Sequence, residues 1–378
     1  MKNPFQYGGV VEGAAFCNRK KELADIGAAV ESSEKLFVYS ERRLGKTSLL
    51  HTALRHLPKR RYAAAYIDLW PTDGEMSFVA AAARAITESL SSTASQLLEV
   101  AKQLFSRLTP SVTTDAEGKP KVTFGFNFSG QPGPEIEEVL AAPAKIAERG
   151  KQRVVIVFDE IQQVLEYESD LVERRLRSII QKHQDVSYIF LGSRKHLIQK
   201  MFLDRSRPLY RAAGHYPLGS IEAAAWIPFI ARKFREGEKI IEQKAIQAVC
   251  RLTEGHPFYT QHLCHALWEL CEPGESVTES LIEAGMKVLL DRESYAYTAL
   301  WESLALNQKR LLNGLASEPA GVKPFSGSFV RRHGLGSPSN AQRAVEGLLH
   351  RDLIDRDNGS FLISDRFFRI WIREKQMQ

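Results

Sequence analysis

The sequence predicts an α/β protein: a three-layer domain built on a parallel sheet, then a small helical domain, then a domain of helices that ends in a β-hairpin. Short apolar stretches alternate with helical stretches through the first 220 residues, which is the order of a parallel sheet with helices on both faces. Residues 154–158 form a continuous apolar run, typical of a strand buried on both sides. Asn358-Gly359 between alternating apolar residues is a strong signal for a hairpin.

The elements of the first domain follow from apolar spacing and from the residues at their ends. A Gly-rich lead-in precedes a helix that runs to about residue 30, with Asn18 as its N-cap. Alternating residues 121–128 indicate a hairpin inserted over residues 110–133. The expected strands are residues 35–39, 61–69, 153–158, 187–192 and 215–218, and the expected helices are 47–57, 77–108 with a break near Ser91, 135–149 and 171–183.

Two smaller units follow the first domain, which is expected to span residues 1–220. Residues 221–295 are helical throughout, with a helix stop and restart at Thr-Glu-Gly-His-Pro, residues 253–257, so a small helical lid is expected. Residues 296–378 contain helices followed by the hairpin, which is the plan of a winged helix.

Composition limits the cellular location and the kinds of partner that the protein is expected to have. No run of about 18 apolar residues is present, the start has no apolar signal segment, and the four cysteines (17, 250, 264 and 271) have no paired spacing. These features predict a cytoplasmic protein without a membrane span. Five units of the net charge of +6 fall in residues 306–378, which hold 12 Lys and Arg against 7 Asp and Glu. This surplus is compatible with nucleic-acid binding, and also with an ordinary basic surface, the commoner case.

Residues 38–50 have the order strand, tight loop and helix start, with Gly45-Lys46-Thr47 in the loop. A loop that enters a helix directs backbone N–H groups and the helix dipole at one point, which suits phosphate. Lys46 would reach the β- and γ-phosphates, and the Thr47 hydroxyl would bind Mg²⁺. Ser40 stands where the P-loop pattern has its first glycine, and serine lacks the freedom of glycine at positive φ.

The apolar run that begins at residue 154 ends in two carboxylates, Asp159 and Glu160. The carboxyl ends of such strands border the crevice in which α/β sheets bind ligands. Asp159 suits Mg²⁺, and Glu160 suits a base that orients the attacking water. The two stretches, in this order, predict a site for ATP or GTP.

These motifs resemble those of the archaeal-type P-loop ATPases in the AAA+-related STAND group, over nearly the whole chain. The resemblance implies a P-loop NTPase core with a helical lid and a C-terminal winged helix, which binds ATP or ADP with Mg²⁺ and hydrolyses ATP. The stretches that carry it are Asn3-Pro4-Phe5, Phe16-Cys17-Asn18-Arg19, Glu22-Leu23, residues 40–49, Phe158-Asp159-Glu160, Arg207-Pro208-Leu209-Tyr210 and residues 253–258.

The resemblance also implies roles for single residues. Phe16 and Arg19 would lie near the adenine, Ser193-Arg194 would be a sensor with Arg194 on the γ-phosphate, and Gly255-His256-Pro257 would pack on the nucleotide. The expected catalytic residues are Glu160, Lys46 and Arg194; the nucleotide-binding residues are Phe16, Arg19, Arg42, Arg43, Leu44, Gly45, Lys46, Thr47, Ser48, His256 and Pro257; and the metal ligands are Thr47 and Asp159.

Two basic groups have competing interpretations. One of Arg205, Arg207 and Arg211 could act as an arginine finger on a neighbouring copy, or all three could be solvated. The helix after Ser337 carries Arg343 and could contact duplex DNA, whereas the acidic wing would repel phosphate, so a protein-contacting or autoinhibitory winged helix is an equal alternative. The histidines and cysteines of residues 256–271 lack the spacing of a zinc site.

The leading hypothesis is therefore an ATP-binding, slowly hydrolysing switch whose nucleotide state sets the position of the lid and the winged helix. The alternatives are a DNA-acting AAA+ ATPase of the loader or transposition-helper type and a nucleotide-dependent interaction module without turnover. A nucleotide-dependent oligomer remains open.

Overall fold

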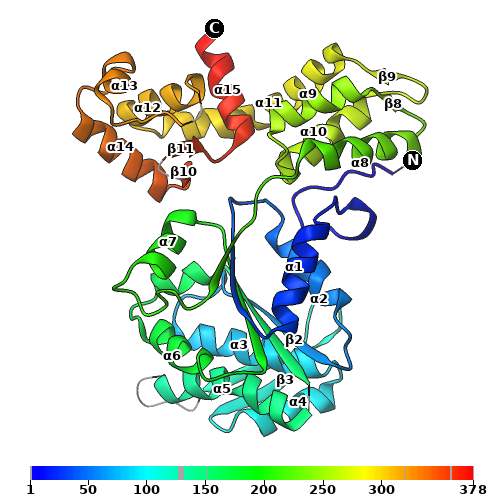
Figure 1. The fold of residues 1–378 in the computed structure, drawn as a ribbon, viewed down its shortest axis with the longest axis vertical. Coiled ribbons are helices and arrows are strands. Elements are labelled where there is room, and N and C mark those ends of the chain that lie inside the picture. The colour runs from blue at the N-terminus through cyan, green and yellow to red at the C-terminus, as the bar shows by residue number, and fades with distance from the viewer. Residues whose placement is uncertain (1, 127–131, 151, 320, 358–359, 378) are drawn as a thin grey trace.

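The computed structural model describes residues 2–126, 132–150, 152–319, 321–357 and 360–377. It confirms the α/β class, with a parallel-sheet core below and the helical and winged-helix domains side by side above it (Figure 1). The sheet has five parallel strands in the order β2-β5-β6-β1-β7. Their bounds are β1 Lys35–Tyr39, β2 Tyr62–Asp68, β5 Arg153–Asp159, β6 Val186–Gly192 and β7 Gly214–Pro217.

Helices cover both faces of the sheet, as the three-layer prediction requires. Val155 and Val157 of β5 face α1 (Lys20–Glu31) and α2 (Lys46–His56), and the alternate residues 154, 156 and 158 face the opposite layer. Residues 154–158 of β5 are continuously apolar because they are buried on both sides of the sheet. The opposite layer contains α3 Glu75–Leu90, α5 Gly133–Gly150, α6 Leu171–Ile180 and α7 Lys195–Leu203.

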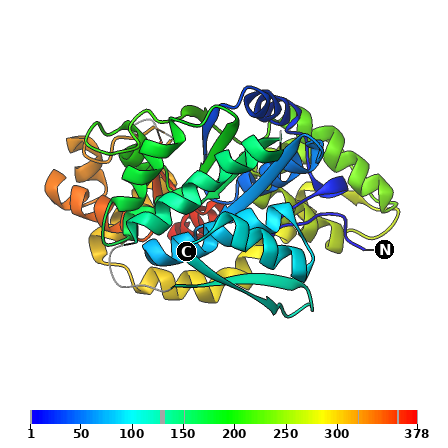
Figure 2. The same cartoon turned by 90° about the horizontal axis from the view of Figure 1, so that it is seen from below.

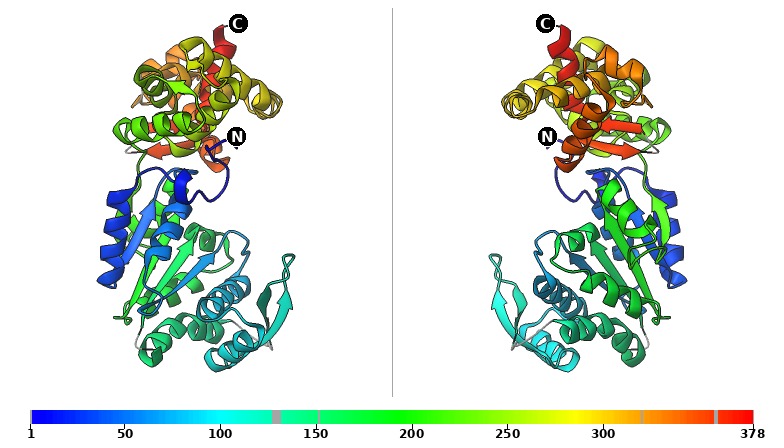
Figure 3. Two further views of the ribbon diagram at one scale, coloured as in Figure 1. Left: turned by 90° about the vertical axis from the view of Figure 1, so that its right-hand side faces the viewer. Right: turned by 90° about the vertical axis from the view of Figure 1, so that its left-hand side faces the viewer.

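The inserted hairpin is present and projects from the side of the core (Figure 2, Figure 3). It consists of β3 (Leu108–Thr114) and β4 (Pro120–Phe126), which pair antiparallel. The helix expected over residues 77–108 is too long, because the chain forms α3, breaks at Ser91 as predicted, and then forms only the shorter α4, Ala94–Leu104. Residues 127–131 of the expected insert lie outside the described residues.

The N-cap expected for α1 is wrong. The residue before the helix is Arg19, and Asn18 and Arg19 both have left-handed backbone angles, with φ of 55° and 67°. The Arg19 guanidinium donates to Leu44 O at 3.3 Å and to Gly219 O at 2.7 Å, and it pairs with Glu22 at 2.7 Å. These distant contacts fix the turn, so the position of Asn18 is not set by local capping.

The helical lid shows the predicted stop and restart. Helix α9 (Gln243–Thr253) ends with Glu254 and Gly255 in left-handed conformation, and α10 (Pro257–Leu270) restarts at its proline. A Cβ at Gly255 would lie 2.2 Å from the Ile221 carbonyl oxygen, so only glycine fits there. The other lid elements are α8 Ala223–Glu236, the short strands β8 Ile240–Ile241 and β9 Ser276–Val277, and the start of α11 Glu279–Glu302.

The C-terminal domain has the expected helices and hairpin. Helix α11 runs without a break across the expected boundary between residues 295 and 296, so the two upper domains share one helix (Figure 1). The Ser337 hydroxyl caps α14 by accepting from Asn340 N at 3.2 Å. The elements are α12 Leu306–Ser317, α13 Gly327–Arg332, α14 Pro338–His350, β10 Ile354–Asp357, β11 Ser360–Ile363 and α15 Arg366–Met377.

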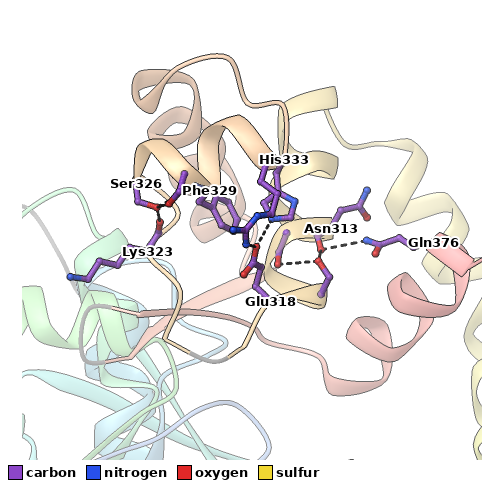
Figure 4. A network of polar contacts seen from close by, with 11 residues as sticks. Asn313, Glu318, Lys323, Ser326, Phe329, His333 and Gln376 are labelled. Carbon is purple, nitrogen blue, oxygen red and sulfur yellow. Dashed lines mark hydrogen bonds and ion pairs between the residues drawn. The ribbon is translucent and has the colours of Figure 1, made fainter.

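Within this domain, the Glu318 carboxylate joins two basic side chains that precede α14 (Figure 4). It accepts from Arg332 and, at 3.1 Å, from His333 Nε2. Arg332 is therefore already paired.

Among the described residues, no helix is long and apolar enough to cross a membrane. The four cysteines are buried free thiols.

Candidate nucleotide-binding site

The loop between β1 and α2 has the geometry of a phosphate loop. Gly45 is the N-cap of α2 with φ of 84°, and Arg43 is also left-handed, with φ of 60°. Ser40 does not have a positive φ, so replacement of the first glycine causes no backbone strain here. The Ser40 hydroxyl instead accepts a hydrogen bond from Lys46 Nζ at 3.0 Å.

Lys46 is buried at the start of α2, where its side chain is suited to an anion. Only 5% of the residue is exposed, and Nζ donates to Ser40 Oγ and, at 3.2 Å, to the Glu41 carbonyl oxygen. Both acceptors are neutral. Burial lowers the pKa of the ammonium group, which shows that the charged form is poorly solvated. An anionic group in the adjoining cavity would therefore be strongly favoured.

The two expected metal ligands lie together. Asp159 Oδ2 accepts from Thr47 Oγ1 at 3.1 Å and also from the Tyr66 hydroxyl, and Asp159 Oδ1 accepts from Glu160 N at 2.9 Å. Burial raises the pKa of Asp159, and the Tyr66 hydrogen bond opposes that shift. No group of three or more His, Cys, Asp or Glu in the described residues could hold a metal. Mg²⁺ usually takes one or two protein oxygens with phosphate and water, so the hydroxyl and carboxylate fit Mg²⁺ bound with a nucleotide.

Glu160 is held at the carboxyl ends of two strands. Its Oε2 accepts from Ser193 Oγ, just beyond β6, at 2.8 Å, and from the Gln162 amide. Glu160 itself has a left-handed φ of 51°, which turns the chain away from β5 directly after Asp159. Glu160 and Ser193 thus border the same cavity, whereas Asp159 lies behind it, next to Thr47.

A cavity of about 550 Å³ lies between the phosphate loop, the N-terminal segment and the lid. Eleven expected residues line it: Phe16, Arg19, Arg42, Arg43, Leu44, Gly45, Lys46, Thr47, Ser48, Glu160 and Pro257. His256 lies behind the loop, where its Nε2 donates to the Arg42 carbonyl oxygen at 3.1 Å. Burial and the nearby Arg366 charge lower the pKa of His256 to about 3, so the ring is neutral.

Two family descriptions match the chain. Residues 16–263 match an ATPase domain predominantly from Archaea, and residues 295–374 match a probable winged helix domain. The chain belongs to this archaeal-type ATPase family. The cavity accordingly lies in a domain that binds nucleotide and hydrolyses ATP.

Solved structures show the same fold at low sequence identity. The Walker-type ATPase PABY2304 of Pyrococcus abyssi has a TM-score of 0.66 and 15% identity, covering 98% of this chain and 99% of the other. The Aeropyrum pernix ORC2 protein, solved as ADPNP-ADP complexes, has a TM-score of 0.54 and 11% identity, covering 95% and 94%. The Aeropyrum pernix ORC1 protein in complex with DNA has a TM-score of 0.50 and 14% identity, covering 97% and 94%. No curated protein matches the chain.

Arg194 of the ATPase faces the winged-helix domain in this conformation. Its Nη2 lies 3.1 Å from Asp352 Oδ2, and its Nη1 lies 3.9 Å from Glu166 Oε1. Arg42 contacts the same Asp352 oxygen at 3.0 Å. The described wall of the large cavity does not include Arg194, so its contact with a γ-phosphate stays a prediction.

Several cavity residues were missed in the sequence. The N-terminal segment joins the lid to the core, because Gln6 N donates to Gln261 Oε1 at 3.1 Å and Val11 N donates to Ser48 Oγ at 2.9 Å. Trp70 also borders the cavity and is 55% exposed. The Gly-rich N-terminal segment has no periodic pattern that would indicate its path over the cavity. Trp70, in contrast, comes just after the expected strand of residues 61–69, and that position could have suggested a place beside the ligand.

The possible arginine fingers of the ATPase differ in their surroundings. Arg207 pairs with Glu173, whose side chain is only 1% exposed, so Arg207 is tied to the core. Arg205 is exposed, and Arg211 is exposed and lies over the Tyr210 ring at 5.3 Å. Only Arg205 and Arg211 are thus accessible to a neighbouring molecule.

Proposed function

We propose that this ATPase is a molecular switch in which bound ATP with Mg²⁺ is hydrolysed slowly and the nucleotide state moves the winged-helix domain. The observation that carries this proposal is the position of Asp352. One oxygen of this winged-helix carboxylate contacts Arg42 of the phosphate loop and Arg194 at the end of β6. A carboxylate of the winged-helix domain thus contacts two cations that we expect at the nucleotide: Arg42, which lines the cavity, and Arg194, which lies outside its described wall.

The residues around the cavity suit the roles expected of them. Lys46 would bind the β- and γ-phosphates, while Thr47 and Asp159 would hold Mg²⁺, which neutralises phosphate charge. Glu160 would accept a proton from the attacking water, and Ser193 would orient its carboxylate. The adenine end would be formed by Phe16 and Arg19, with Arg43, Leu44, Gly45, Ser48, His256 and Pro257 completing the nucleotide-binding set.

The energetics of the Asp352 contact suit a reversible latch. The Asp352 and Arg194 side chains are 21% and 24% exposed, and Arg42 is 44% exposed. Ion pairs exposed to this degree are worth only about 0.2–1 kcal/mol each. A γ-phosphate near Arg194 carries more negative charge than one carboxylate and could displace it. The winged-helix domain would then be released from the core, and hydrolysis would allow it to return.

The test is a distance measurement on the full chain. Fluorophores at the exposed positions Gln103 on α4 and Ser328 on α13 would report the separation of core and winged-helix domain without nucleotide, with ADP and with ATP. ATP should increase the separation, and Asp352→Asn should increase it without ATP and tighten ATP binding severalfold. Glu346→Gln, an exposed carboxylate on α14, is the matched control. Equal separation in all three nucleotide states would refute the switch.

A second candidate function is DNA binding through the winged helix. Gln342 and Arg343 are exposed on α14, and the similar Aeropyrum pernix ORC1 protein was solved in complex with DNA. Arg332, in contrast, is paired with Glu318, and β10 packs against α7 of the core. Fluorescence anisotropy of the full chain with duplex DNA at several salt concentrations decides between the functions, because phosphate contacts give a steep salt dependence. If the partner of this domain is a protein, the anisotropy of the duplex DNA should not change when the full chain is added, at any salt concentration.

We also propose the domain bounds, the cellular location and the oligomeric behaviour that the sequence predicts. The chain would divide into a core of residues 1–220 with the insert at 110–133, a lid of residues 221–295 and a winged-helix domain of residues 296–378. It would act in the cytoplasm, and ATP could favour an oligomer, which size-exclusion chromatography with ATP and with ADP would detect. Undetectable turnover with tight nucleotide binding would instead indicate an interaction module.

A further inference from the structure

Arg366, the first residue of α15, connects the winged-helix domain to both other domains. It is only 5% exposed. Its Nη1 lies 2.8 Å from Glu41 Oε2 in the phosphate loop, and its Nε lies 3.2 Å from Glu254 Oε2 at the end of α9. Neither of these two nitrogens makes a hydrogen bond within the described residues, so the attraction is mainly Coulombic. One guanidinium group thus touches the core and the lid from the third domain.

The Glu41 contact leads directly to the phosphate site. The carbonyl oxygen of Glu41 accepts from Lys46 Nζ at 3.2 Å and from Ser40 Oγ at 2.8 Å. The residue whose carboxylate Arg366 holds is therefore the residue whose backbone holds Lys46. The next carbonyl oxygen, that of Arg42, accepts from His256 of the lid. The outer side of the phosphate loop is thus anchored by both upper domains.

We propose that Arg366 is a positioning residue for the phosphate loop: through Glu41 it keeps the loop and Lys46 in the geometry that binds the β-phosphate of a nucleotide. The docked winged-helix domain consequently retains ADP. This inference rests on the nucleotide site proposed above, and it adds a device that acts in the opposite sense to Asp352. Asp352 competes with phosphate for cations, whereas Arg366 prepares the loop that phosphate occupies.

The geometry suits arginine at this position. The two carboxylates are reached by different nitrogens of one planar group, whereas a lysine would offer a single nitrogen to both. The Glu41 side chain is 14% exposed, so solvent screens the pair weakly. Small displacements of groups that orient a ligand have large effects on binding and reaction rates.

The test compares ADP affinity in full-length variants, measured with a fluorescent ADP analogue, with thermal stability followed in parallel. Arg366→Met should weaken ADP binding about tenfold or more, and Arg366→Lys by an intermediate factor. Arg369→Met is the matched control, because Arg369 lies on the same helix and its ion pair is with Glu254 Oε1. That control should stay within about twofold.

A purely structural role makes a different prediction. Arg366→Met would then lower the melting temperature and leave the ADP affinity of the folded protein unchanged, and that result would overturn the inference. If Arg366→Met does not fold, Arg366→Lys and Glu41→Gln carry the test, and unchanged ADP affinity in both refutes it. The switch can fail separately: unchanged domain separation in Asp352→Asn, together with weakened ADP binding in Arg366→Met, rejects the switch and supports the positioning role.

Discussion

Replacing Glu160 by glutamine should separate ATP binding from ATP hydrolysis. The carboxylate lines the cavity and accepts from Ser193 and from the Gln162 amide. Glutamine has the same size and can still accept a hydrogen bond through its carbonyl oxygen, but it cannot take a proton from water. General-base assistance is worth about 10²–10⁴-fold in rate. This corresponds to about 2.7–5.5 kcal/mol of activation free energy.

The assay is single-turnover hydrolysis with protein in excess over ATP, together with ATP affinity by calorimetry. We expect Glu160→Gln to bind ATP within about threefold of wild type and to hydrolyse it at least about 10²-fold more slowly. Ser193→Ala is the companion variant, because it removes only the 2.8 Å hydrogen bond that orients the carboxylate. Its hydrolysis rate should fall less, by about tenfold.

Three outcomes would count against this reasoning. Hydrolysis by Glu160→Gln at the wild-type rate would show that another group activates the water. A fall in ATP affinity as large as the fall in rate would show that the carboxylate supports the shape of the cavity instead of the chemistry. A rate in Ser193→Ala as low as that in Glu160→Gln would shift the catalytic role toward the Ser193 hydroxyl.

The remaining predictions concern two buried groups. Lys46→Ala should reduce ATP affinity at least about 10²-fold by calorimetry, because it removes a buried cation beside the phosphate loop, and unchanged affinity would contradict the site. His256 stays neutral down to about pH 3, whereas its ordinary pKa is 6.5. The unfolded chain therefore binds a proton that the folded chain does not, so stability should fall as the pH drops below about 6.5. Between pH 7 and pH 5, His256 should contribute about 1–2 kcal/mol to the loss of stability measured by denaturant unfolding, and other histidines whose pKa values are lowered by burial add to that loss. His256→Asn should reduce the loss by this contribution, and an equal loss in that variant would exclude His256.

The strand, phosphate loop and helix start could be predicted because their signals are local. Gly45 stands where the chain needs a positive φ. Thr47 lies in the segment that follows the apolar strand β1, and Asp159 is the last residue of the apolar strand β5. Parallel pairing then brings them to one edge of the sheet. The break near Ser91 and the restart at Pro257 were predictable for the same reason. Sequence spacing of a few residues carries all of this information.

Contacts between distant residues explain where the prediction failed. Asn18 looked like an N-cap, yet its turn is set by the contact of Arg19 with Gly219, 200 positions away. A side chain that meets such a partner can override a local capping preference worth about 1 kcal/mol. The length of the helix after residue 77 was overestimated because the apolar residues Phe105 and Leu108 are three positions apart, a spacing that also suits a helix, whereas Leu108 in fact begins β3 and pairs with β4.

Asp352 shows what a local charge pattern cannot convey. The acidic residues near the expected hairpin, Asp352 among them, argue against contact with DNA phosphates, but Asp352 lies just before β10 and its partner Arg42 is 310 positions away in the phosphate loop. In the docked conformation, Asp352 therefore has a structural role, because it pairs with Arg42 and Arg194. Its negative charge would oppose DNA binding only if the side of the domain that carries it faced the DNA. Under the proposed switch, the γ-phosphate of ATP would release Asp352 from Arg42 and Arg194 and free the winged-helix domain to approach DNA. If both functions operate in this ATPase, ATP binding and DNA binding would be coupled, and DNA affinity should rise with ATP and fall with ADP.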